Sequence, residues 1–379
     1  MKLIALKDVC KINMGQSPNS SSYNDYGDGM PFFQGNADFG ERYPITRVWC
    51  NTPTKIAQAE DILISVRAPI GALNYAKEEC CIGRGLAAIT PDRNKVSQDF
   101  IYWALKGKKA ELNDKGNGST FKAISRKILE ETMIPDINFE QQHKCAENLE
   151  KIYGIIQNRR KELLALDDLI KARFVEMFGD PVVNDKRWST MPLEEACKII
   201  VDCPHSTPSY TTEDTGYMCI RTSIVKKNKI IWDEIEFIPK DEFEKRIKRK
   251  KPEVGDVVYT REGAILGIAA VIDKECNVVL GQRAMLLSPD ENMITSEFLC
   301  IAMNCDSFLI NALKGVAGSA SPHINVGDIK AFKMIMPPLE LQNKFSDFIR
   351  QVDKSKVAVQ KALDETQTLF DSLMQEYFG

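Results

Sequence analysis

The sequence predicts a mixed α/β (α+β) protein built from two similar halves, each followed by one long helix. The segment from Gln142 to Gly179 superposes without a gap on Gln342 to Gly379, a shift of 200 residues. The halves also open alike, because LKDVCKI (6–12) and LEEACKI (193–199) are related by a shift of 187. Upstream of each long segment, apolar stretches rich in β-branched residues are broken by glycine, which is typical of strands and turns. We therefore expect a duplicated chain.

The order of local patterns predicts the kind of sheet. DILISV (61–66), CIGRGLAAIT (81–90), DVVYT (256–260) and VVLGQRAMLLS (278–288) have the composition of strands. LKDVCKI and LEEACKI are expected to be short amphipathic helices, and SQDFIYWALKG (97–107) and SEFLCIAMN (296–304) form a second helical pair. Helices and strands do not alternate regularly enough for a doubly wound sheet. Curled, mainly antiparallel sheets with a few helices are expected instead.

Each long segment contains no proline and has one apolar seam. Leu149, Ile152, Ile156, Leu163 and Ile170 recur at a 3-4 spacing, and the same seam returns 200 positions later. A helix of 38 residues is about 57 Å long, more than a small domain is wide. The two helices are therefore expected to pack antiparallel on each other, although each could simply cover its own sheet. The expected divisions are globular domains at 1–140 and 180–338, and helices at 141–179 and 339–379.

Composition excludes several classes of protein. No apolar run approaches the length of a membrane span, and MKLIALKDVC lacks the features of a signal peptide. Eleven cysteines without a CxxC pair suggest free thiols in a reducing compartment, and with three histidines they make a metal site improbable. We expect a cytoplasmic protein that holds neither metal nor cofactor.

Sequence signatures of catalysis are missing. The chain has no GxxxxGK[ST] phosphate loop, no HExxH and no GxSxG. MPPLEL (336–341) contains two prolines without the polar and aromatic neighbours found in the adenine-binding motif of amino-methyltransferases. The chain therefore has the pattern of a binding protein whose chemistry belongs to partners.

A known family has this arrangement. GMPFFQGN (29–36) and GYMCIRTS (216–223) stand early in the two halves, and DILISVRAPIG (61–71) and DVVYTREGAILG (256–267) follow. Each half then ends in a proline exit with E-x-Q, in IPDINFEQQ (134–142) and MPPLELQ (336–342), and FGDPVVNDKRW (178–188) joins them. In order and spacing, over nearly the full length, the chain closely resembles the specificity subunit of type I restriction–modification systems.

The resemblance implies two target-recognition domains that each read one half of an asymmetric, split site in double-stranded DNA. The paired helices would then be spacers and docking surfaces for two modification subunits, which bind S-adenosylmethionine and methylate adenine N6. Restriction subunits, which use ATP and Mg²⁺, would join for cleavage. Three alternatives stay open: a non-catalytic scaffold that binds proteins, an inactive or regulatory copy of such a subunit, and an enzyme with an unfamiliar site.

Candidate DNA-reading residues lie beside glycines. Gln34 and Asn36 align with Arg221 and Ser223. Gln and Asn can pair with adenine and Arg with guanine in the major groove, although such residues also cap turns or face solvent. Arginines beside turns are candidates for phosphate or base contacts, and Arg261 could equally pair with Glu262. The further candidates are Arg67, Arg84, Arg261, Gln282 and Arg283 in strands and turns, Lys115, Asn117, Ser119, Lys122, Ser319, Ser321 and His323 in loops, and Lys248, Arg249 and Lys250 in the basic run KRIKRKK (245–251), which could also be a solvated surface.

Overall fold

The computed structural model describes residues 2–116, 122–314 and 322–379. The chain divides into two compact units, the first comprising Met1–Arg160 with Gln360–Gly379 and the second Lys161–Val359. Two helices, α5 (Phe139–Phe178) and α11 (Leu339–Phe378), contribute residues to both units. The bounds of the two helices differ by the expected 200 positions.

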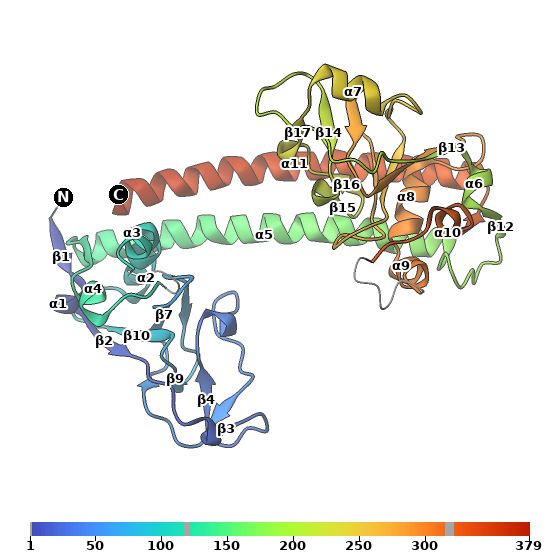
Figure 1. The fold of residues 1–379 in the computed structure, drawn as a ribbon. Coiled ribbons are helices and arrows are strands. Elements are labelled where there is room, and N and C mark those ends of the chain that lie inside the picture. The colour runs from blue at the N-terminus through green and yellow to red at the C-terminus, as the bar shows by residue number, and fades with distance from the viewer. Residues whose placement is uncertain (1, 117–121, 315–321) are drawn as a thin grey trace. The chain divides into compact units, whose positions relative to one another are not determined.

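The first unit contains two main sheets (Figure 1). One has the order β2-β10-β7-β8 and is antiparallel throughout. The other has the order β3-β5-β4-β9-β6, in which β4 and β9 form a parallel pair. The strands are β1 (Leu3–Ala5), β2 (Cys10–Met14), β3 (Tyr23–Asn24), β4 (Met30–Phe33), β5 (Trp49–Cys50), β6 (Ile56–Ala57), β7 (Ile62–Ser65), β8 (Leu73–Tyr75), β9 (Cys80–Ile82), β10 (Leu86–Pro91) and β11 (Met133–Pro135), and the short helices are α1 (Leu6–Val9), α2 (Gln98–Gly107), α3 (Lys109–Asp114) and α4 (Arg126–Glu130).

The second unit repeats this plan. Its antiparallel sheet has the order β13-β21-β18-β19, and its second sheet, β17-β14-β20, again contains one parallel pair, β14 with β20. The strands are β12 (Ser189–Pro192), β13 (Cys197–Asp202), β14 (Met218–Ile220), β15 (Val225–Lys226), β16 (Lys229–Ile230), β17 (Glu236–Phe237), β18 (Val257–Thr260), β19 (Ala269–Val271), β20 (Val278–Leu280), β21 (Ala284–Pro289) and β22 (Lys333–Met336), and the helices are α6 (Leu193–Ala196), α7 (Lys240–Arg246), α8 (Ser296–Asn304), α9 (Asp306–Ala312) and α10 (Val326–Lys330).

The expected duplication and the mainly antiparallel sheets are confirmed, but the opening helices are shorter than expected. In LKDVCKI only Leu6–Val9 is helical, and the chain continues directly as strand β2 from Cys10. Cys10 and Ile12 are buried while Lys11 is exposed, which is the two-residue period of a strand pairing with β10. Strand alternation therefore prevails over the helical pattern after one turn. LEEACKI makes the same switch, with Leu193–Ala196 helical and β13 beginning at Cys197, but a register shift between Cys197 and Ile199 leaves both Lys198 and Ile199 exposed.

Within each unit, the parts of α5 and α11 that belong to it pack against each other in antiparallel fashion. In the first unit the ring of Tyr153 lies 6.0 Å from that of Phe370, and Asn148 hydrogen-bonds Tyr377 at 3.3 Å. In the second unit Lys356 pairs with Asp167 at 2.7 Å, and further along α5 Arg173 lies 5.8 Å from the ring of Phe348. Every position of the expected seam is buried or half-buried, so the pairing inferred from its spacing is confirmed.

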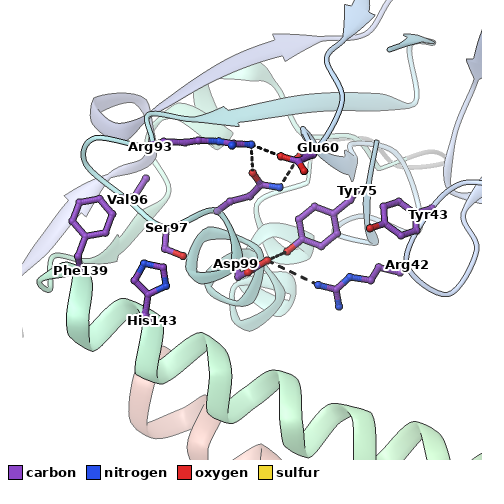
Figure 2. Close-up of a pocket in the computed structure, with 11 residues that line it drawn as sticks. Arg42, Tyr43, Glu60, Tyr75, Arg93, Val96, Ser97, Asp99, Phe139 and His143 are labelled. Carbon is purple, nitrogen blue, oxygen red and sulfur yellow. Dashed lines mark hydrogen bonds and ion pairs between the residues drawn. The ribbon is translucent and has the colours of Figure 1, made fainter. Parts of the chain in front are cut away.

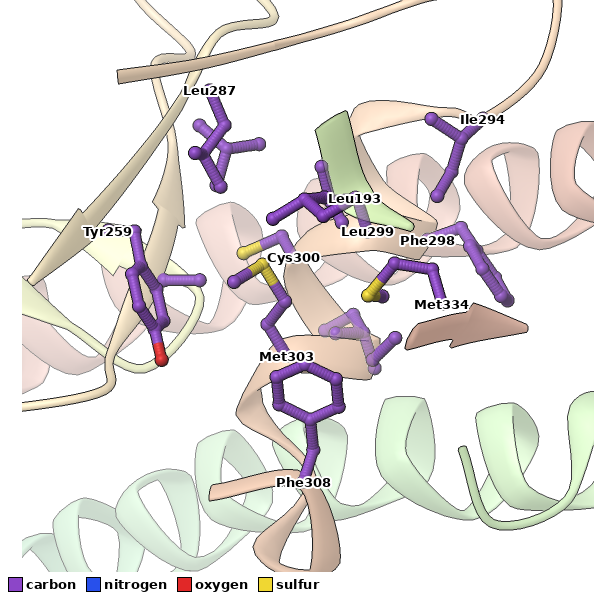
Figure 3. Packing of buried hydrophobic residues seen from close by; sticks show 14 of the residues in the cluster. Leu193, Tyr259, Leu287, Ile294, Phe298, Leu299, Cys300, Met303, Phe308 and Met334 are labelled. Atoms are coloured by element: carbon purple, nitrogen blue, oxygen red, sulfur yellow. The ribbon is translucent and has the colours of Figure 1, made fainter. Parts of the chain in front are cut away.

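The helix ends also explain why FVEMFG (174–179) is echoed by LMQEYFG (373–379) at the chain's end. Phe178 stacks edge-on against Phe298 of α8 at 4.8 Å, inside the core of the second unit. Its repeat equivalent, Phe378, lies 5.6 Å from Phe100 of α2 in the first unit. Figure 3 shows Phe298, Leu299 and Met303 of α8 within the second core. Each long helix thus ends in the hydrophobic core that contains the other copy's sheets.

The E-x-Q motif at the start of each long helix has a structural role. Gln142 and Gln342 are almost fully buried. The Oε1 atom of Gln142 accepts from the backbone N–H of Ser97 at 2.7 Å, and that of Gln342 accepts from Thr295 at 2.9 Å. Their Nε2 atoms donate to the backbone carbonyls of Ile137 and Pro337. Each glutamine therefore satisfies buried backbone groups where the long helix meets the unit, as buried polar groups require.

Candidate nucleic-acid interface

Four segments that supply candidate residues meet at one edge of the first unit. The backbone N–H of Gly85 donates to the carbonyl of Gln34 at 3.2 Å, and that of Val66 donates to Gly85 at 2.9 Å. The N–H of Ala68 then donates to the carbonyl of Lys122 at 3.1 Å. This ladder holds the loops after β4, β7 and β9 beside the segment before α4. The side chains of Gln34, Arg67, Arg84 and Lys122 are all exposed there.

The second unit forms the same ladder from repeat-equivalent segments. The N–H of Gly281 donates to the carbonyl of Ile220 at 2.9 Å, and the N–H of Arg261 donates to the carbonyl of Arg283 at 3.0 Å. The ladder continues through Gly263, which donates to Pro322 at 3.1 Å. Arg221, Ser223, Gln282, Arg283 and His323 therefore border one edge. We name the two regions edge 1 (Gln34, Asn36, Arg67, Arg84, Lys122) and edge 2 (Arg221, Ser223, Gln282, Arg283, His323).

Close backbone approach makes glycine necessary at edge 1. A Cβ atom added to Gly85 would lie 2.4 Å from the carbonyl oxygen of Gln34, nearer than any real contact. Strand register aligns Gly85 with Arg283, because Leu86 pairs with Ser65 as Ala284 pairs with Thr260. Arg283 has a φ of 71°, in the left-handed region that non-glycine residues seldom adopt. The second copy therefore has a long exposed cation where the first has no side chain.

Strand register also separates the two arginines that the sequence suggested as a pair. Ser65 corresponds to Thr260, so Val66 corresponds to Arg261 and Arg67 corresponds to Glu262. The isolated bridges agree, since Arg67 faces Ala123 as Glu262 faces His323. Successive residues of a strand point to opposite sides, and a one-residue offset therefore exchanges an exposed position for a buried one.

Arg261 is engaged inside the second unit. It is 6% exposed, and its Nε atom donates to Asp202 at 2.9 Å while Nη2 pairs with Glu262 at 2.6 Å. Nη1 also reaches the carbonyl of Ile324 at 3.5 Å. Arg67, by contrast, is exposed. A DNA contact by Arg261 stays untested, but these contacts are those of a structural arginine, which is the alternative noted from the sequence.

The positions proposed to read bases lie on short turns. Asn36 opens a 3₁₀ turn, Asn36–Asp38, and Ser223 lies in the corresponding turn, Thr222–Ile224. The backbone N–H of Gln34 donates to Asp38, which leaves its exposed side chain outside that contact. Arg221 pairs with Glu236 at 2.9 Å and lies 5.6 Å from the ring of Tyr210. Its guanidinium is therefore oriented before any ligand arrives.

The remaining candidates are Lys115, the residues of the basic run, and four positions outside the described ranges. Lys115 pairs with Glu111 at 2.6 Å on the surface of the first unit. Four candidates, Asn117, Ser119, Ser319 and Ser321, lie outside the described residues. In the basic run, Lys250 pairs with Glu253 and Asp256, and Arg249 donates to the carbonyl of Asp202. Lys248 is exposed and forms no ion pair within the described part of the chain.

Sequence reasoning missed two loops that border these edges. Ser17 Oγ accepts from the backbone N–H of Arg84 at 3.2 Å, and Thr207 Oγ1 accepts from the side chain of Gln282 at 2.6 Å. Each hydroxyl residue precedes a proline, in Ser17-Pro18 and Thr207-Pro208, shortly after the first long strand of its copy. A hydroxyl residue followed by proline at this point of both copies was the sequence signal that could have identified these loops.

A cavity of about 400 Å³ lies elsewhere in the first unit, between α2 and the start of α5 (Figure 2). Several of its polar groups are partnered within the pocket: Tyr75 donates to Asp99 at 2.8 Å, and Arg93 pairs with Glu60. Burial and the neighbouring Asp99 carboxylate raise the pKa of Tyr75, which keeps the phenol protonated. Tyr75 is therefore not activated as a nucleophile in this pocket.

All eleven cysteines are unpaired thiols, and ten of them have a pKa raised by burial, as for Cys300 at about 12. Raised values keep the thiols protonated and unreactive. The described ranges contain no group of three or more side chains suited to hold a metal ion. In the same ranges, no helix is both long enough and apolar enough to cross a bilayer.

The comparisons with known proteins agree with this arrangement. Residues 1–165 and 185–366 match the family described as the type I restriction modification DNA specificity domain. A relative in Methanocaldococcus jannaschii, provisionally named the MjaX specificity subunit of a type I restriction enzyme, is 47% identical over 152 residues, which is 40% of this chain. The chain spans 36% of that relative's length.

Two further similarities extend over nearly the whole chain. The EcoBI specificity subunit of a type I restriction enzyme in Escherichia coli is 22% identical, over 99% of this chain and 85% of its own length. The crystal structure of a type I restriction–modification S subunit from M. genitalium has a TM-score of 0.60 at 14% identity, and the match covers 100% of this chain and 96% of that one, which supports the fold. With both copies of its repeat matched, the chain belongs to the family of type I restriction–modification DNA specificity proteins.

Proposed function

We propose that this chain selects the DNA sequence on which a type I restriction–modification complex acts, and that it is not itself an enzyme. Edge 1 and edge 2 each contact one half of a split, asymmetric site in double-stranded DNA. Residues 1–140 and 180–338 are the two recognition domains, and 141–179 and 339–379 are helical spacers. Two modification subunits carry S-adenosylmethionine and methylate adenine, while restriction subunits supply ATP- and Mg²⁺-dependent cleavage in the cytoplasm.

The observation that carries this proposal is the repetition of one edge with different side chains. Gln34 of the first copy corresponds to Arg221 of the second, and Arg84 corresponds to Gln282. Gln pairs with the adenine edge and Arg with the guanine edge in the major groove. Because Gln and Arg are exchanged between the two edges, the edges are expected to read two different DNA half-sites. Two identical edges would instead read the two identical halves of a palindromic site.

The long helices carry features of a docking surface for the modification subunits. α5 exposes Leu164 (65%) and Val175 (55%), and α11 exposes Val357 (71%) and Leu369 (52%). A partner that covers these side chains removes their apolar surface from water, which favours association. We assign the partners to these faces.

The test is to map methylated adenines in cells that express the chain with its modification subunits. Arg221→Ala should relax one base pair of the second half-site, at a cost of about 1–3 kcal/mol, and leave the first half-site unchanged. Gln34→Ala should do the converse.

Matched controls are Arg187→Ala and Gln141→Ala, which alter exposed side chains of the same types outside either edge. An unaltered motif in both Arg221→Ala and Gln34→Ala would remove the two edges as the reading surfaces. Absence of any DNA-dependent behaviour in the wild type would leave a protein scaffold or an inactive copy as the function.

A further inference from the structure

A small cavity of about 210 Å³ lies in the second unit beside the run KRIKRKK. Its lining combines apolar side chains with mainly cationic ones. Among the described residues that line it, five are basic and one, Asp202, is acidic. The apolar members include Val201, Val279, Leu280 and Leu286, and the basic members are Lys245, Arg246, Lys248, Arg249 and Lys250.

Part of this positive charge is not compensated. Lys245 pairs with Asp241 at 2.9 Å, and Lys250 pairs with Glu253 at 2.7 Å and with Asp256. Arg249 forms no ion pair with any residue that the structure describes, and its contact with the backbone carbonyl of Asp202, at 3.3 Å, neutralises no charge. Within the described ranges Lys248 forms no ion pair. The basic residues that line the cavity therefore keep a local positive potential that attracts anions.

Arg246 supplies an independent observation. It is 8% exposed, and its Nε atom donates to Glu242 at 2.6 Å. Nη2 donates to the carbonyl of Ser206 at 2.8 Å and to its hydroxyl at 3.1 Å. Nη1 is buried and has no acceptor among the residues that the structure describes. Buried donors normally find an acceptor, so the unpartnered Nη1 of a residue that lines this cavity indicates a ligand oxygen. Because Nη1 is buried in the free chain, that oxygen comes into contact once the guanidinium shifts towards the cavity.

We propose that this cavity binds a phosphate group, with Nη1 of Arg246, Lys248 and Arg249 as its donors. A tetrahedral phosphate offers acceptors in several directions and suits guanidinium and ammonium donors together. The exposed side chains of Lys248 and Arg249 are long enough to rearrange around it. The phosphate comes either from the backbone of bound DNA, which rests on the proposed function, or from a free phosphate ester.

The first arm measures inorganic phosphate binding to the full-length chain by isothermal titration at constant ionic strength, with chloride as the replaced anion. Lys248→Met with Arg249→Met should weaken binding at least tenfold. Lys198→Met, which removes an exposed lysine of β13 that does not line the cavity, should leave binding unchanged. Arg246 is kept, because truncating a buried arginine would also disturb Glu242.

The second arm identifies the source by measuring DNA affinity against salt. If the site holds a backbone phosphate, the double variant loses about one unit of salt slope for each phosphate that it no longer contacts, equally for all sequences. Phosphate binding with an unchanged slope assigns the site to a free phosphate ester. Non-saturable phosphate binding in the wild type, or an equal loss in the Lys198→Met control (an adventitious ion only), would overturn the proposal. A wild type that binds phosphate and no DNA would refute the proposed function alone.

Discussion

Arg67 and Arg261 look alike in the sequence and should respond oppositely to the same change. We compare Arg67→Met with Arg261→Met in the full-length chain. Arg261 is buried with Asp202 and Glu262, whereas Arg67 is exposed at edge 1. The first substitution should affect DNA binding and the second the stability of the second unit.

The contacts set the size of the effect. Removing one member of a buried ion pair costs about 3–5 kcal/mol, because the remaining charge stays buried. The Asp202 side chain is 18% exposed and keeps a contact with His205 at 3.1 Å, so the lower end, about 3 kcal/mol, applies. For a unit of this size that corresponds to a fall in Tm of about 6–12 °C. Arg67→Met, at an exposed position, should change stability by no more than about 0.5 kcal/mol.

Thermal unfolding followed by circular dichroism measures the loss of stability expected for Arg261→Met, and a gel-shift series against salt measures the loss of DNA binding expected for Arg67→Met. Because the chain has two units, unfolding is fitted as two transitions rather than one. Arg67→Met should keep both transitions and weaken DNA binding, with a salt slope smaller by about one unit if Arg67 contacts a phosphate.

Unchanged transitions in Arg261→Met would show that its ion pairs contribute no net stability. If that variant also lost DNA affinity, Arg261 would belong to the reading surface after all, and the register argument would be wrong.

Two further predictions concern the first unit and the long helices. Lys106 lies 3.7 Å from the ring centre of Tyr153, and burial lowers its pKa from 10.5 to about 8. The pKa of Lys106 is lower in the folded chain than in the unfolded chain, so its buried charge destabilises the fold. This destabilisation is complete below about pH 8 and disappears as the pH rises to 10.5. Lys106→Met should therefore raise the free energy of unfolding near pH 7.5 by up to about 3 kcal/mol, at about 1.36 kcal/mol for each unit by which the pKa is lowered. Urea titrations should show this gain shrinking towards pH 10. A gain that is constant with pH would contradict this. Inserting four residues near Leu163 and near Leu363 lengthens each helix by about 6 Å, so the gap between methylated half-sites should grow by about one or two base pairs, at roughly 3.4 Å each. Retention of the original gap in an assembled, active variant would show that the partner subunits set the distance.

Several parts of the candidate site could be predicted from the sequence, because aligning the two copies shows which positions are equivalent. Aligning the copies placed Gln34 opposite Arg221, and backbone hydrogen bonds bring the equivalent segments together in both units. The offset between Arg67 and Arg261 could be counted, since aligning the two segments from Asp61 and Asp256 places Arg67 opposite Glu262. Which of the two positions is buried could not be read from the sequence. Only the pairing of β7 with β10 and of β18 with β21 fixes which residue faces outward.

The sequence by itself determined the duplication, the main strands and the helical seam, because each is a local or periodic pattern that two copies display independently. Only the tertiary structure decided that Phe178 packs into the core of the second copy and Phe378 into the core of the first. It also decided that Gln142 and Gln342 bind buried backbone groups. Only it showed the cavity beside Arg246. These features join residues far apart in the chain, and local periodicity specifies which side of an element is apolar but not which distant side chains it will meet.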